Sequence, residues 1–204
     1  MFRLNGNSNQ ISWVGGSVVG HSIDKYTNEI DLTEGFGAFD SIFNLSYALS
    51  GRALDIGGGA SDANCAYVAQ RYLLDSVVYD PYMRDPTHNQ KVLAVAKKRP
   101  FDIAFSLSIL NVINDEESRK NHIRLCLSTL KPSGKAIFKV WSGDNSGIGK
   151  LTQSGYQSNL DIEKYFDEIA AVFGKDRVKF DEQQKAFICF NNRDTYPSGS
   201  VFLV

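Results

Sequence analysis

The sequence predicts a single α/β domain built around a mostly parallel β-sheet. Three observations predict it. Short apolar runs alternate with segments of helical periodicity from residue 51 onward. The 204 residues suffice for one sizeable core, and the 43% hydrophobic and 22% charged fractions are those of an ordinary globular protein. We therefore expect one domain over residues 1–204, with residues 1–50 as an N-terminal helical cap or extension and residues 51–204 as the core.

The first expected element is a helix over residues 36–49. Ile42, Leu45 and Leu49 recur there at helical spacing, and Gly51 can end the helix.

A strand, a helix and a second strand follow. Residues 53–56 form an apolar run that predicts a buried strand, and residues 63–74 carry helical periodicity with Asp62 at the N-cap. Residues 75–79 predict the second strand, which Asp80 and the next proline end.

The middle of the chain repeats this alternation. Residues 89–98 predict a short helix, residues 101–107 an apolar strand, and residues 116–130 a helix. A Lys-Pro-Ser-Gly turn at residues 131–134 then leads into a strand at residues 135–141.

The last elements change the character of the sheet. Residues 161–173 predict a helix that ends at Gly174, and residues 177–180 and 185–190 predict two strands close enough to form a hairpin. The helix-linked strands imply right-handed parallel units. The expected sheet is therefore mostly parallel with a C-terminal antiparallel hairpin.

Composition and charge narrow the function. A net charge of −1 gives no global field that attracts nucleic acid, although a local basic patch stays open. Cys65, Cys126 and Cys189 are far apart, which favours reduced, buried thiols over disulfides or a metal site. The sequence shows no signal-peptide run and no apolar stretch of membrane-spanning length. We expect a cytoplasmic protein without a membrane partner and predict nothing about its oligomeric state.

The turn after the first strand reads Asp-Ile-Gly-Gly-Gly-Ala-Ser-Asp over residues 55–62. Ligands of open α/β sheets bind beyond the carboxyl ends of the strands, where glycines let a ligand approach the backbone. An ordinary glycine-rich turn is the alternative. Asp62 replaces the third glycine of the dinucleotide pattern. A carboxylate there is unfavourable for a pyrophosphate but acceptable to S-adenosylmethionine, which carries an amino group and a sulfonium.

Asp80 stands at the end of the second strand, 23 positions after Gly57. A carboxylate at this place can accept hydrogen bonds from both hydroxyls of a ribose. The alternative is a turn residue before Pro81, which aspartate also favours.

These motifs resemble those of class I S-adenosylmethionine-dependent methyltransferases. ALDIGGGASD and VVYDPY are similar to their first two motifs, FDIAFSLSILNVI to their fourth-strand motif, and LKPSGKAIFKV to the turn before their fifth strand. The resemblance covers residues 51–190 and implies a Rossmann-like fold with S-adenosylmethionine as cofactor. Residues 80–101 depart from it, because they offer no clear third strand and no counterpart of the acidic residue that contacts adenine.

The resemblance also implies site residues. It places the methionine moiety by Asp55, Gly57 and Gly59 and the ribose on Asp80. Tyr82 could stack on the adenine, or be a surface aromatic. The predicted cofactor-binding residues are Asp55, Gly57, Gly58, Gly59, Asp62, Asp80, Pro81, Tyr82, Ser106 and Leu107.

The sequence says less about the binding site of the methyl acceptor. Residues 142–159 form a long glycine-containing stretch after the last parallel strand, which predicts a mobile polar lid over a substrate. The predicted substrate residues are Asn111, Trp141, Tyr156 and Gln157. A general base is needed only for a protonated nucleophile, and the candidates are Tyr156, Asp144 and His21. His122 is better explained as a structural residue within a helix.

Three functions stay open. The first is an S-adenosylmethionine-dependent methyltransferase with an unidentified acceptor. The second is a catalytically silent methyltransferase-like subunit that binds the cofactor or a partner. The third is a nucleotide-dependent oxidoreductase, which Asp62 disfavours.

Overall fold

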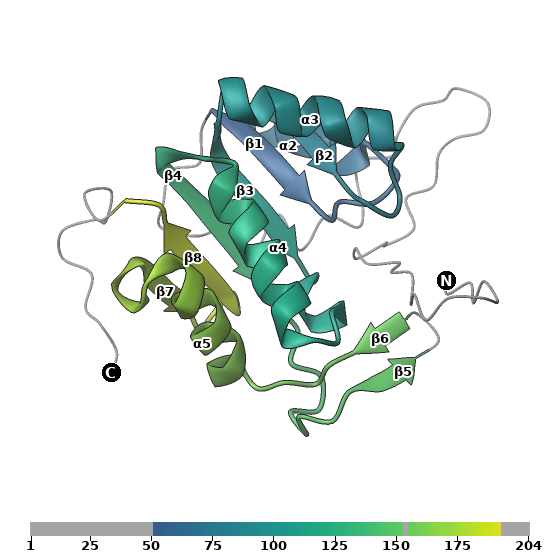
Figure 1. Ribbon diagram of the computed structural model, residues 1–204, viewed down its shortest axis with the longest axis vertical. Helices are drawn as coiled ribbons and strands as arrows, with labels where there is room; N and C mark the ends of the chain where they lie inside the picture. The colour runs from purple at the N-terminus through teal and green to yellow at the C-terminus, as the bar shows by residue number, and fades with distance from the viewer. Residues whose placement is uncertain (1–50, 153–154, 193–204) are drawn as a thin grey trace.

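The computed structural model describes residues 51–152 and 155–192. The expected helix at residues 36–49, the N-terminal cap and His21 lie outside the described residues. Figure 1 shows the arrangement of the elements.

A six-stranded sheet with the order β2-β1-β3-β4-β8-β7 forms the centre of the described chain. β2, β1, β3 and β4 are parallel, whereas β8 and β7 form an antiparallel hairpin that extends the sheet beyond β4. The predicted sheet is therefore confirmed. Its strands are β1 (Arg52–Ile56), β2 (Asp75–Tyr79), β3 (Phe101–Leu107), β4 (Leu130–Lys139), β7 (Val178–Asp181) and β8 (Ala186–Phe190).

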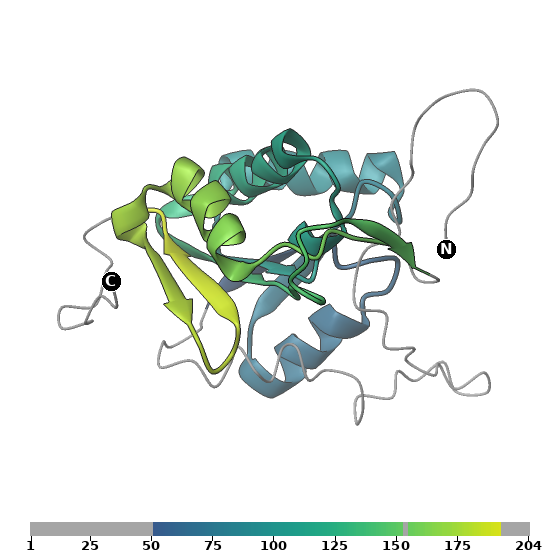
Figure 2. The same ribbon diagram turned by 90° about the horizontal axis from the view of Figure 1, so that it is seen from below.

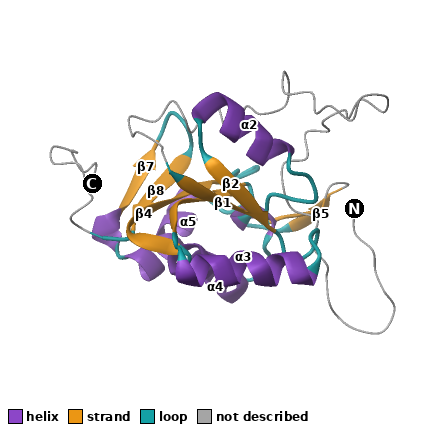
Figure 3. Cartoon of the chain, turned by 90° about the horizontal axis from the view of Figure 1, so that it is seen from above, coloured by secondary structure: helices purple, strands orange, loops and turns teal. Residues whose placement is uncertain are grey.

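Helices cover both faces of the sheet. Figures 2 and 3 show α2 on one face and α3, α4 and α5 on the other. Three of them begin at an aspartate whose carboxylate accepts a backbone N–H of the first turn, namely Asp85, Asp115 and Asp161. The α-helices are α2 (Ala63–Tyr72), α3 (Pro86–Lys98), α4 (Glu116–Ser128) and α5 (Ile162–Phe173), with short 3₁₀ turns η1 (Leu110–Val112) and η2 (Lys175–Arg177).

The connections of the sheet reverse direction beside β1. α2 leads from β1 to β2 on one side, whereas β3 lies on the other side of β1 and is followed by α4 and β4. Such a reversal opens a crevice at the carboxyl ends of the strands. Between β2 and β3 the chain forms α3 and no strand, which confirms that the third strand of the usual pattern is missing.

Several boundaries differ from the prediction. α3 begins at Pro86 rather than at residue 89, because Asp85 caps it and proline suits the first helical position. β4 begins at Leu130, which pairs with Phe101 of β3, but the register shifts before Lys135 pairs with Ile103, and residues 131–134 lie in that shift. A Cβ at Gly134 would lie 3.0 Å from the Lys131 carbonyl oxygen, so the chain turns within β4 where the sequence predicted a turn.

The predicted loop at residues 142–159 contains secondary structure. β5 (Lys150–Thr152) and β6 (Gly155–Gln157) pair as a small antiparallel sheet. In Figure 1 this hairpin lies on the side toward which the arrowheads of β1, β3 and β4 point. The expectation of a stretch without secondary structure was wrong, although its position beside the ligand-binding edge is as predicted.

The buried core has one cluster on each face of the sheet. Leu54, Ile56 and Phe138 belong to the larger cluster, which includes side chains of α3, α4 and α5. Ala53 and Phe105 belong to the smaller cluster, which includes Val68 of α2. Alternate residues of β1 therefore support opposite layers, as expected for a strand covered on both faces.

Two further findings concern expectations from composition. Cys65, Cys126 and Cys189 are free and buried, as predicted. Within the described residues, no helix combines the length and apolar character needed to cross a membrane.

Candidate functional site

The glycine turn after β1 has a backbone that other residues adopt with difficulty. Gly57 and Gly59 have φ values of +89° and +81°. The N–H of Gly57 donates to the carbonyl of Tyr79 at 2.8 Å, and the N–H of Gly59 donates to Oδ2 of Asp80 at 3.0 Å. The turn is thus held against the end of β2 through two of its own amides.

Gly57→Val is expected to destabilise the fold more than Gly59→Val and to abolish binding of S-adenosylhomocysteine. Both replacements impose backbone strain of about 1–3 kcal/mol. A side chain at position 57 would also collide with Ile109, whereas a Cβ at position 59 meets no atom within 4 Å; overpacking adds about 1–3 kcal/mol. Urea denaturation of the two variants checks the order. Equal losses would show that contact with Ile109 is unimportant.

Asp80 is the residue that organises this edge of the site. Its Oδ1 accepts the N–H groups of Tyr82 and Met83 at 2.9 Å and 3.0 Å, in addition to the Gly59 bond on Oδ2. A carboxylate offers about four acceptor positions. With 3% of its surface exposed, Asp80 keeps roughly one position for a ligand hydroxyl.

Arg84 is a residue that sequence reasoning missed. Its Nε donates to the carbonyl of Gly59 at 2.8 Å, and its Nη2 pairs with Oδ1 of Asp62 at 2.8 Å. Asp62 stands at the N-cap position of α2, as predicted, although its side chain makes no capping hydrogen bond. Because Arg84 offsets its charge, Asp62 repels a pyrophosphate less than the sequence alone implied.

Asp55 lies beneath the turn. It is 4% exposed, and the side-chain amide of Asn64 donates to its Oδ2 at 3.3 Å. Burial, and secondarily the nearby Asp80, raise the pKa of Asp55 to about 6, against a lowering by Asn64. A side chain at Gly58 would collide with this carboxyl group. An ammonium group of a ligand near Asp55 would stabilise the charged form.

Asp55→Asn is expected to remove a pH dependence of stability. The pKa rises from 3.8 to about 6 on folding, so the folded chain binds a proton more tightly than the unfolded chain. The stabilisation by this proton is complete below 3.8 and is lost as the pH rises through 6. Relative to the variant, the wild type should therefore gain stability from pH 7.5 to pH 5. Urea denaturation at both values measures the difference; parallel pH curves would contradict the assignment.

A cavity of about 300 Å³ opens where the ends of β1 and β2 face η1 and α4. This volume is at the lower end of the range for small-molecule sites. Of the predicted cofactor residues, Gly57, Asp80, Pro81 and Tyr82 line it. The remaining lining residues are Ile56, Tyr79, Ile109, Val112, Ile113, Ser118, Asn121, His122 and Leu125.

The other predicted cofactor residues lie beside the cavity rather than in its wall. Ser106 is 1% exposed, and its hydroxyl is 2.8 Å from Nε2 of His122. Leu107 points to the opposite face of the sheet, in the smaller core cluster. Asp55, Gly58, Gly59 and Asp62 belong to the turn but do not line the cavity. Their binding roles stay predictions.

Three of the predicted substrate residues lie together and are joined to one another by hydrogen bonds. Nδ2 of Asn111 donates to Oε1 of Gln157 at 3.1 Å, and Nε2 of Gln157 donates to the carbonyl of Trp141 at 3.0 Å. The N–H of Ser158 also donates to the carbonyl of Asn111 at 2.8 Å. These bonds fasten the β5–β6 hairpin to η1. The Trp141 side chain is exposed.

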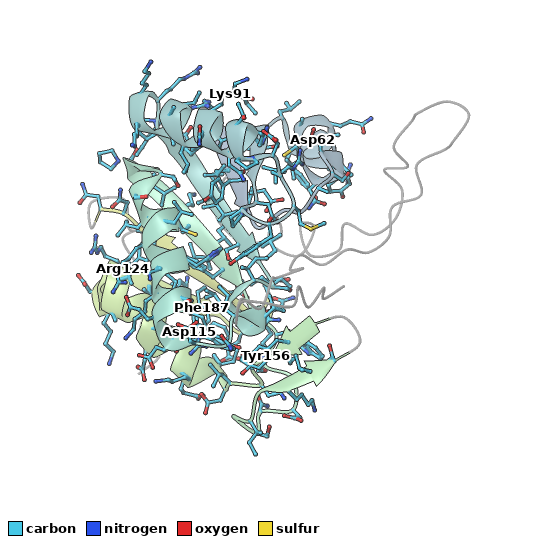
Figure 4. The ribbon with its side chains drawn as sticks, turned by 45° about the vertical axis from the view of Figure 1, so that its right-hand side comes forward. Asp62, Lys91, Asp115, Arg124, Tyr156 and Phe187 are labelled. Carbon is cyan, nitrogen blue, oxygen red and sulfur yellow. The ribbon has the colours of Figure 1, made fainter. Side chains whose placement is uncertain are left out.

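The two described candidates for a general base lie on or beside the hairpin. The Tyr156 hydroxyl rests against Gly149, where a Cβ would collide with it. Figure 4 shows Tyr156 well away from Asp62 at the start of α2. Asp144 is half-exposed and pairs with Lys150 at 2.8 Å. Hydrogen bonds from Lys150 and Ser146 hold the pKa of Asp144 below its ordinary value, which weakens it as a base.

Comparisons with known proteins concern the fold. No protein-family model matches the sequence, and no curated protein matches it. The sugar N-methyltransferase KedS8 from Streptoalloteichus sp. superimposes with a TM-score of 0.51 at 11% identity, covering 76% of this chain and 85% of that chain. The chain has the class I methyltransferase fold. This superposition and the strand order support that conclusion, whereas the missing third strand is a departure from the usual pattern.

Two other solved structures give lower scores. CalS10, an amino pentose methyltransferase from Micromonospora echinaspora solved with S-adenosylmethionine bound, has a TM-score of 0.47 at 15% identity over 76% of this chain and 89% of that chain. DesVI from Streptomyces venezuelae has a TM-score of 0.48 at 12% identity over 75% and 89%.

The described residues contain no group of three His, Cys, Asp or Glu side chains placed to hold a metal ion.

Proposed function

We propose that this chain binds S-adenosylmethionine at the cavity beside the glycine turn and transfers its methyl group to an acceptor. The observation that carries the proposal is Asp80, which lines the cavity and joins the Gly59 amide to the end of β2. A ribose hydroxyl can take its remaining acceptor position. The open space above Gly59 leaves room for the methionine part. When bound, the sulfonium supplies an activated methyl group, so the protein's main task is alignment.

Several backbone N–H groups of the turn already donate hydrogen bonds within the protein, which favours S-adenosylmethionine over a dinucleotide. A pyrophosphate at a helix start needs several free backbone N–H groups. Here the N–H groups of Gly57 and Gly59 are already bonded to Tyr79 and Asp80, and the N–H of Ala63 donates to the Ser61 hydroxyl at 3.1 Å. These occupied N–H groups support the proposal independently of Asp62, whose charge Arg84 offsets.

The acceptor side is proposed to lie toward the β5–β6 hairpin. Asn111, in η1 beside the cavity, donates a hydrogen bond to Gln157 on the hairpin. Trp141 and Tyr156 are the predicted acceptor contacts there. The hairpin's hydrogen bonds to η1 favour a fixed wall over the mobile lid that the sequence predicted. A catalytically silent subunit would keep the same cofactor site but show no turnover.

Titration calorimetry separates these functions. We expect S-adenosylhomocysteine to bind and NAD to give no heat of binding at the same concentrations. Binding of NAD alone would replace the proposal with the oxidoreductase alternative. Binding of S-adenosylhomocysteine without methyl transfer to any acceptor, tested with radiolabelled S-adenosylmethionine, would favour the silent subunit.

A further inference from the structure

One wall of the cavity belongs to α4, a helix for which the sequence predicted no cofactor contact. Three polar side chains of α4 line the cavity: Ser118, Asn121 and His122. The opposite walls are mostly apolar and come from β1, η1 and the turn after β2. A flat aromatic ligand between these walls would have one edge at α4.

The three polar side chains differ in which of their hydrogen-bonding groups are already used. Oδ1 of Asn121 accepts a hydrogen bond from Nη1 of Arg124 at 2.7 Å. Ser118 is engaged with Asp115 by both its side chain and its N–H, and these bonds lower the pKa of Asp115. His122 is half-buried, and within the described chain its ring bonds to one partner, Ser106, through Nε2.

The second ring nitrogen of His122 therefore faces accessible space. No buried side-chain nitrogen or oxygen in the described part of the chain lacks a partner. Nδ1, which has none, must keep accessible surface, and His122 lines the cavity. Burial lowers the pKa of His122 to about 4, so the ring is neutral near pH 7. When Nε2–H donates to the Ser106 hydroxyl, Nδ1 is a hydrogen-bond acceptor directed by a buried partner.

We propose that Nδ1 of His122 accepts a hydrogen bond from the 6-amino group of the cofactor's adenine. The inference rests on the proposed function. It gives adenine recognition to α4 at a site where residues 80–100 form no third strand to supply an acidic contact. Ser106 acts as a positioning residue, because its hydroxyl bonds Nε2 and leaves Nδ1 as the ring nitrogen available to a ligand. The exocyclic amine is the hydrogen-bond donor on this edge of adenine, and Nδ1 is the acceptor that meets it.

The test compares two ligands in calorimetry: S-adenosylhomocysteine and its analogue in which hydrogen replaces the 6-amino group. The analogue lacks the amino donor, so Nδ1 finds no partner on it when Nε2 carries the ring proton. We expect the wild type to bind it about tenfold more weakly, the cost of a buried polar atom left unpaired. His122→Ala and His122→Phe should reduce this ratio to less than threefold, and the phenylalanine variant keeps the volume of the ring.

His88→Ala is the matched control. His88 is also a half-buried histidine with Nε2 bonded to one oxygen, the Val78 carbonyl at 2.8 Å, but it does not line the cavity. It should leave the ligand ratio unchanged. Equal binding of the two ligands to the wild type would overturn the proposal without any variant. The proposal would also be overturned if both folded His122 variants kept the wild-type ratio of affinities for the two ligands. Failure of the wild type to bind S-adenosylhomocysteine would instead contradict the proposed function.

Discussion

Glu168→Ala is expected to lower the free energy of unfolding by about 3–5 kcal/mol, the typical cost of breaking a buried ion pair. Nε and Nη2 of Arg119 donate to the two carboxylate oxygens of Glu168, each at 2.7 Å. The side chains are 5% and 1% exposed. Removal of the carboxylate leaves a guanidinium charge inside the α4–α5 interface. Urea denaturation followed by circular dichroism measures the loss.

A surface pair on the same helix provides the control. Lys120 and Glu116 lie 2.6 Å apart at i,i+4 spacing and are more exposed, so Lys120→Ala should cost at most about 0.5 kcal/mol. The double variant Arg119→Met/Glu168→Leu should recover much of the loss, because it leaves no unpaired charge. Similar costs for Glu168→Ala and Lys120→Ala would show that the buried pair is energetically like a surface pair.

The Arg119–Glu168 ion pair also contributes to the structure of the proposed cofactor site. Nη1 of Arg119 donates to the carbonyls of Ile113 and Asn114 at 2.9 Å and 3.1 Å. Ile113 lines the cavity. The ion pair between α4 and α5 therefore supports the segment that forms one wall of the proposed cofactor site.

Asp80→Asn is expected to weaken S-adenosylhomocysteine binding by more than tenfold. An amide has one acceptor oxygen and would direct its NH₂ group toward backbone N–H groups that now find a carboxylate oxygen. Hydrogen bonds to charged groups contribute about 1.5–3 kcal/mol, and about 1.4 kcal/mol is a factor of ten in affinity. The variant should also unfold more easily, since each unpaired buried N–H costs about 1–3 kcal/mol. Calorimetry and urea denaturation measure the two effects.

Asp75→Asn serves as the comparison for Asp80→Asn. Asp75 begins the strand that Asp80 follows, and its exposed side chain pairs with Arg52 at 3.3 Å. Its replacement should change affinity less than twofold. Unaltered affinity in a folded Asp80→Asn variant would remove Asp80 from the site and reduce its role to stabilising the turn.

Much of the framework was predictable because local patterns carry it. The apolar residues 101–107 gave the same bounds as β3, and Asp161 and Gly174 bound α5 as expected. The short stretch between β2 and β3 also predicted the missing third strand. The predicted turn at residues 131–134 lies within β4, where the register of its pairing with β3 shifts.

The candidate site was predictable only where it depends on backbone geometry. Glycines at positions 57 and 59 and a carboxylate after β2 are local signals, and the sequence alone determined them together with the fold class. The partners of side chains depend instead on which elements meet in space. Ser106 reaches His122 across β3 and α4, Asn111 reaches Gln157 over 46 positions, and Arg84 reaches Asp62 over 22. Hydrophobic periodicity reports which face of an element is buried but not which polar group it meets there, so only the tertiary structure decided that α4 forms a wall of the cavity.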